Sequence, residues 1–70
     1  MTNEEMIRKM KVEINGWISH LRIEHEKHGR SEWYQRSYDR ICGMIRMLSI
    51  VTGNDYYFDE KGLHERSVEE

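Results

Sequence analysis

Four histidines in a chain of 70 residues make a metal site the first chemistry to consider. His25 and His28 lie about one helical turn apart, and Glu24 precedes His28 by four residues, so these side chains could converge on one ion. Zinc needs four ligands, or three and a water molecule, and the further candidates are His20 and the distant His64. Histidines near a helix C-terminus also interact well with the helix dipole. We favour this second interpretation and predict no metal and no cofactor.

Cys42 is the single cysteine and the one candidate for a strong nucleophile. A nucleophilic role needs a histidine within hydrogen-bond reach and a cleft. Cys42 instead lies between Ile41 and Gly43 in the middle of a predicted helix, which is typical of a structural residue. The sequence has no glycine-rich phosphate loop and no paired-carboxylate motif. We therefore predict that the protein is not an enzyme.

The elements that position these side chains begin with a long helix over residues 3–28. Thr2 to Glu5 fits a capping box at its start, and Gly29 is the predicted left-handed cap at its end. Its apolar residues recur at spacings of three and four, which places them in one stripe facing a core. These residues are Met6, Ile7, Met10, Ile14, Trp17, Ile18 and Leu21.

A second helix is predicted over residues 31–52, with Ser31 suited to its N-cap and Gly53 to its end. The connection between the two helices is short, which favours antiparallel neighbours. At 1.5 Å per residue the helices are about 39 and 32 Å long, so they can pair along most of their length.

The remaining residues, 54–70, form an aromatic and acidic tail. Tyr56-Tyr57-Phe58 and Leu63-His64-Glu65 flank the turn-forming segment Asp59-Glu60-Lys61-Gly62, which predicts two very short strands. An isolated hairpin of this size is not stable in water. We expect its aromatic residues to dock on the helices, over their open end.

Length and charge limit what this chain can be. It forms at most one domain, residues 1–70, and a domain this small buries only about 60% of its unfolded surface. Its single cysteine excludes an intrachain disulfide and, with no apolar signal segment, indicates a cytoplasmic protein. The net charge of −2 is divided between +2 over residues 1–48 and −4 over residues 49–70. That charge is too small to indicate nucleic-acid binding by itself. No apolar segment of the sequence is long enough to cross a membrane.

The second helix carries more apolar surface than one partner helix can cover. One stripe suits the seam with the first helix and consists of Tyr34, Tyr38, Ile41, Ile45 and Leu48. A neighbouring stripe, interrupted by Arg40, consists of Trp33, Met44, Met47 and Val51. A patch of this size is rarely exposed on a monomer. The predicted fold is therefore mainly all-α, an antiparallel helical hairpin with a short C-terminal β-hairpin-like tail, dimerising into a four-helix bundle through this second stripe.

Two alternatives to a simple homodimer remain open. The methionine-rich stripe could serve a different protein, because such surfaces adapt to varied partners. The second helix could also bind nucleic acid along an arginine-rich edge, with Trp33 and Tyr34 as stacking groups. That edge comprises Lys27, Arg30, Arg36, Arg40 and Arg46. Interleaved acidic residues and the lack of a third supporting helix favour the protein-binding interpretation.

We therefore predict a small, homodimeric, non-enzymatic interaction module that binds and modulates another macromolecule. By analogy, chains of this type occur among bacterial and phage accessory proteins, including inhibitors. The dimer interface is predicted at the second stripe of the second helix. A second protein partner, which the sequence does not identify, is expected to contact the tail at Tyr56, Tyr57, Phe58, Asp59 and Glu60.

Overall fold

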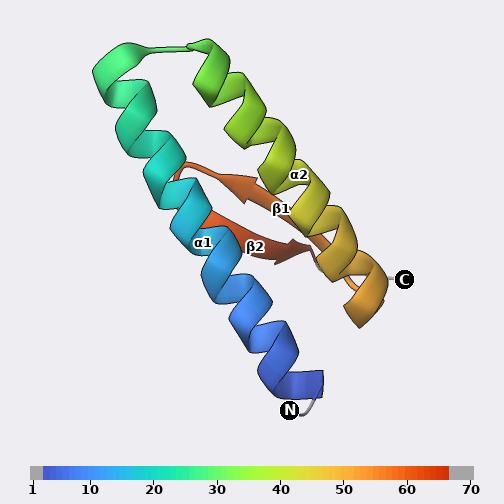
Figure 1. The fold of residues 1–70 in the computed structure, drawn as a ribbon. Helices are drawn as coiled ribbons and strands as arrows, with labels where there is room; N and C mark the ends of the chain where they lie inside the picture. Colours follow the sequence, from blue (N-terminus) through green and yellow to red (C-terminus); the bar gives the residue numbers. More distant parts are fainter. Residues whose placement is uncertain (1–2, 67–70) are drawn as a thin grey trace.

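A computed structural model describes residues 3–66, which form two helices followed by two strands (Figure 1). Helices α1 (Asn3–His28) and α2 (Glu32–Thr52) pack as an antiparallel hairpin, and strands β1 (Asp55–Asp59) and β2 (Gly62–Arg66) pair in antiparallel fashion. The predicted helical hairpin and short strand pair are confirmed. The predicted capping residue Thr2 and residues 67–70 of the tail lie outside the described residues.

The helix ends follow from local sequence. Gly29 adopts a φ of 69°, and its N–H donates to the carbonyl of His25 at 2.9 Å. Ser31 is the N-cap of α2, and its hydroxyl accepts a hydrogen bond from the Tyr34 N–H at 3.1 Å. Gly53 ends α2 with a φ of 76°, a left-handed conformation that glycine adopts at little cost. The chain therefore reverses sharply at both ends of α2.

The core lies where the two helices and β1 meet. Ile41 and Leu48 of α2 are completely buried, and Ile14 of α1 is almost so. Tyr56 of β1 closes this cluster from the side of the strands. The core comprises Ile14, Ile18, Leu21, Ile41, Ile45, Leu48 and Tyr56. Three of the five residues predicted for the helix seam on α2 are therefore buried, whereas Tyr34 and Tyr38 lie at its edge.

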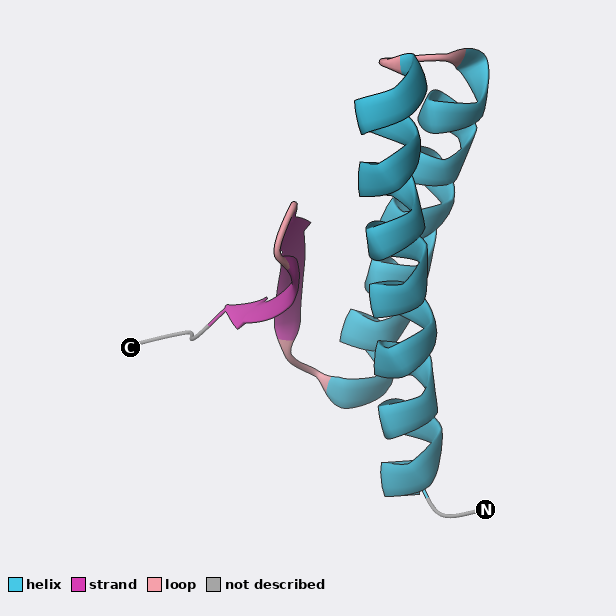
Figure 2. Cartoon of the chain, turned by 90° about the vertical axis from the view of Figure 1, so that its left-hand side faces the viewer, coloured by secondary structure: helices cyan, strands magenta, loops and turns pink. Residues whose placement is uncertain are grey.

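The strand pair covers one face of the helix pair, with β1 against α2 and β2 against α1. Figure 2 shows both strands on the same side of the helices. The expected position over the open end of the helices was wrong, because the strands lie over their middle (Figure 1). The reason is the reversal at Gly53, which directs the chain back along the helices.

Asn15 of α1 holds the strand pair against the helices. Asn15 accepts a hydrogen bond from the Leu63 N–H through its Oδ1 at 2.9 Å. The same oxygen would lie only 2.8 Å from a Cβ at Gly62, whose φ of 131° is also outside the range of other residues. Glycine is thus required at the start of β2 for two reasons, close approach to α1 and backbone conformation.

Replacing Gly62 with alanine is expected to lower the free energy of unfolding by about 1–3 kcal/mol, because the strained backbone and the contact with Asn15 both oppose a side chain. Gly16→Ala is the matched control. Gly16 lies within α1, and the space that an alanine methyl group would enter is open, so this substitution should raise stability by about 0.5–1 kcal/mol. Urea unfolding followed by circular dichroism measures both. Equal midpoints for Gly62→Ala and the parent protein would contradict the docking described here.

Candidate functional site

The side of the helix pair opposite the strands has no covering layer among the described residues (Figure 2). We call it the open face and define it by six apolar side chains, two from α1 and four from α2. They are Met10, Trp17, Trp33, Met44, Met47 and Val51. The last four are the residues predicted for the dimer interface, and their helical spacing places them on one side of α2.

Three of these side chains remain well exposed in the single chain. Met47 retains 55% of its accessible surface, Val51 51% and Trp33 38%. Met44 is half-buried and packs against the core, as does Met10 across from it on α1. The open face thus consists of a half-buried floor between the helices and more exposed side chains along α2.

A groove of about 510 Å³ runs between the helices on this face. Its walls are mainly apolar, and Gly43 of α2 contributes no side chain to them. Apart from its chain neighbours and the nearby backbone of α2, no atom lies within 4 Å of the place where a Cβ of Gly43 would stand, so the groove is open at that point. The lining residues are Lys9, Met10, Glu13, Ile14, Arg40, Gly43, Met44 and Met47.

Arg40, which interrupts the apolar stripe of α2, packs against an aromatic ring of α1. Its guanidinium carbon lies 5.0 Å from the centre of the Trp17 ring, which is a cation–π contact. Trp17 and Trp33 line a smaller hollow of about 210 Å³ with buried Ser37. The ring of Trp33 in turn lies 5.0 Å from that of His20. Sequence reasoning assigned Trp17 to the helix seam alone, although its position at the edge of the α1 stripe was a signal for this second role.

The five tail residues predicted to bind a partner do not share one surface. Tyr56 is buried in the core, and Phe58 is half-buried with its ring 5.1 Å from that of Tyr38. Tyr57, Asp59 and Glu60 are exposed. The division follows from strand geometry, since successive side chains of β1 point to opposite faces.

The outer face of the strand pair is a compact polar and aromatic cluster. The rings of Tyr57 and His64 stack with their centres 5.1 Å apart, and Arg66 lies 5.2 Å from the Tyr57 ring. His64 Nε2 is 2.9 Å from Asp59 Oδ1. This hydrogen bond, followed by that from the Lys61 N–H, lowers the pKa of Asp59.

The histidines considered for metal binding do not converge on one point. His20 and His28 flank Glu24 at 3.9 and 3.8 Å, whereas the His25 ring packs 5.1 Å from that of Tyr34. Within residues 3–66, no three or more His, Cys, Asp or Glu side chains are grouped to hold a metal ion.

Partial burial, followed by the charge of Asp39, raises the pKa of the Cys42 thiol, which disfavours its reactive thiolate at neutral pH.

Three of the arginines considered for nucleic-acid binding already have partners within the chain. Arg36 forms an ion pair with Glu32 at 2.8 Å, Arg40 covers Trp17, and Arg30 lies 6.0 Å from the Tyr34 ring. No specific observation therefore favours a nucleic-acid site. In the described part of the chain, neither helix is long and apolar enough to cross a membrane.

No protein family model matches the chain, and no curated protein or solved structure is significantly similar to it. What the protein does is therefore inferred from its own residues and their geometry.

The Asp59 and His64 pair predicts how the strand pair responds to acid. Because the folded-state pKa of Asp59 is lowered, its hydrogen bonds stabilise the strand pair above the ordinary carboxyl pKa. That contribution is lost as the pH falls through the folded-state pKa. In an NMR titration, the Asp59 carboxyl carbon should have a midpoint below about 3.9, the ordinary value for Asp.

His64→Phe is the informative variant, because phenylalanine keeps a ring against Tyr57 but removes the hydrogen bond to Asp59. The Asp59 midpoint should move upward, although not fully, since the Lys61 N–H still donates to the carboxylate. An Asp59 midpoint of about 3.9 in the parent protein would show that the hydrogen bond between Asp59 and His64 is not formed. The same conclusion would follow if the His64→Phe variant had the same Asp59 midpoint as the parent protein.

Proposed function

We propose that the protein is a small, non-enzymatic homodimer, in which two copies pack open face to open face as a four-helix bundle, and that this dimer binds and modulates another macromolecule. The observation that carries the proposal is the one-sided cover of the helix pair. The strands shield one face, while the other exposes large apolar side chains around an apolar groove. Exposed patches of this kind mark interaction sites.

The dimensions of the open face suit a stable pair of chains. α2 has 21 residues, or a length of about 32 Å, and two packed helices are about 20 Å wide. Contact over most of that area would bury roughly 600 Å² on each copy and roughly 1,200 Å² in total, the lower end of the range for specific interfaces.

A second copy is the partner that best fits the shape of the face. Met47 is a protruding apolar side chain beside a groove that is widened at Gly43. A twofold axis applies every contact twice, so Met47 of each copy can enter the groove of the other. The unbranched methionine side chain adapts readily to such a groove.

The charges around the groove are compatible with this arrangement. Lys9 and Arg40 are basic and Glu13 is acidic, so a second copy meets both signs of charge rather than a uniformly repulsive surface. Four apolar anchors from α2, with Met10 and Trp17 of α1, would form the centre of the interface. Tryptophan, methionine and arginine are the residues enriched at such centres.

The outer face of the strand pair stays free in this dimer, because it lies on the opposite side of the helices. Tyr57, Asp59 and Glu60 are exposed there and offer one aromatic and two acidic groups to a further protein. A non-enzymatic module of this kind acts by covering a surface of its target. This is consistent with a cytoplasmic accessory or inhibitor protein of a bacterium or phage.

Met47→Glu tests the dimer. We expect the parent protein to sediment as a dimer at tens of micromolar and the variant to dissociate at least about 100-fold more readily, because each dimer would bury two unpaired carboxylates. Val12→Glu is the matched control, since Val12 is 67% exposed and its helical position on α1 is nearly opposite those of Met10 and Trp17. It should remain dimeric.

Sedimentation equilibrium at several concentrations measures the dimer dissociation constants, and thermal unfolding checks that both variants are folded. A parent protein that sediments as a monomer at tens of micromolar would overturn the homodimer. Equal dissociation of the Met47→Glu and Val12→Glu variants would place the interface elsewhere.

A further inference from the structure

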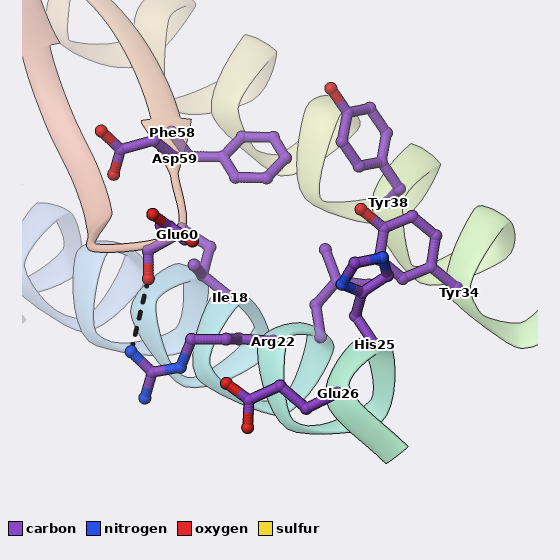
Figure 3. A pocket seen from close by; sticks show the side chains of 10 residues that line it. Ile18, Arg22, His25, Glu26, Tyr34, Tyr38, Phe58, Asp59 and Glu60 are labelled. Atoms are coloured by element: carbon purple, nitrogen blue, oxygen red, sulfur yellow. Dashed lines mark hydrogen bonds between the residues drawn. The ribbon is translucent and has the colours of Figure 1, made fainter. Parts of the chain in front are cut away.

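A second cavity lies on the strand side of the molecule, away from the open face (Figure 3). It has a volume of about 360 Å³ and is formed where the turn between β1 and β2 approaches both helices. This volume lies within the range of about 300–1,000 Å³ typical of small-molecule sites. None of the residues that define the open face lines it.

Four rings from three different elements form one wall of this cavity. The ring of His25 lies 5.1 Å from that of Tyr34, and Tyr34 lies 6.2 Å from Tyr38. Tyr38 lies 5.1 Å from Phe58 of β1. Figure 3 shows these side chains around a common space, with Ile18 at its base. Aromatic rings that line a cavity can attract a cation through their electron-rich faces.

The charged residues around the cavity are mainly acidic. Glu26, Asp59 and Glu60 contribute three carboxylates, against one cation, Arg22. Arg22 reaches toward the turn, where its Nη1 donates to the Glu60 carbonyl at 3.4 Å (Figure 3). The Asp59 carboxylate is held by His64 and the Lys61 N–H, which fixes its position beside the cavity. The surrounding field therefore favours a positively charged occupant.

We propose that this cavity binds a small quaternary ammonium compound of about the size of choline. The methylated cation would lie against the rings of Tyr34, Tyr38 and Phe58, where cation–π attraction and apolar contact act together. A quaternary ammonium group has no N–H to satisfy, which suits a ring-lined wall. A primary ammonium is more strongly hydrated and loses more on entering such a site.

The first test uses choline as the probe and 3,3-dimethylbutan-1-ol as its neutral isostere, in ¹H–¹⁵N NMR titrations of the full chain. Choline should cause saturable shifts of the amides of Tyr38 and Phe58, with a Kd on the order of 1 mM. The neutral isostere should bind at least about tenfold more weakly, because it has the same shape without the charge. Equal binding of both compounds, or no saturable shift with choline in the millimolar range, would overturn the proposal.

The second test uses matched tyrosine variants. Tyr38→Leu removes a ring of the wall, whereas Tyr57→Leu removes a similarly exposed ring on the outer face of the strands. Tyr38→Leu should weaken choline binding about tenfold, and Tyr38→Phe, which keeps the ring, should retain it. Tyr57→Leu should bind as the parent does. Equal effects of the Tyr38→Leu and Tyr57→Leu substitutions, or no effect of Tyr38→Leu, would contradict a cation held by this wall.

Discussion

Two helices packed side by side have two broad faces, and the described chain supplies a covering layer for only one of them. The strand pair occupies that face, and Tyr56 is the side chain that joins it to the helix core. Asn15 fixes its position by binding the Leu63 N–H, a contact between residues 48 positions apart. The described residues supply no second layer, so large apolar side chains such as Met47 and Val51 stay exposed in the single chain.

This one-sided cover separates the surface into regions with different chemistry. The open face is apolar, with a groove between α1 and α2. The ring-lined cavity lies under the turn of the strands and is bordered by carboxylates. The outer face of the strands is polar and aromatic. The open face shares no defining residue with the other two regions, whereas the cavity and the outer strand face meet at Asp59 and Glu60 in the turn.

The sequence predicts best what depends on local interactions. Gly29, Ser31 and Gly53 mark helix ends because each satisfies backbone groups of its own neighbours. The seam residues Ile41, Ile45 and Leu48 follow from helical periodicity alone. The strand pair is likewise predicted from its turn residues, Asp59 to Gly62.

The sequence predicts poorly what depends on contacts between distant segments. Alternation along β1 separates Tyr56 from Tyr57 but does not say which one faces the helices, and this decides which side chain is free for a partner. The position of the strands depends on Asn15, whose polar side chain gives no periodic signal. The cover of Trp17 by Arg40 requires that α1 and α2 already be packed together.

In the proposed dimer a second copy covers the open face of the helix pair, and isotope-filtered NMR tests this contact directly. In a mixture of chains with ¹³C-labelled methionine methyl groups and unlabelled chains, nuclear Overhauser effects between the two kinds of chain should reach the methyl groups of Met44 and Met47. Their absence at concentrations where the protein is associated, or their replacement by contacts to Tyr57 on the outer strand face, would contradict the account.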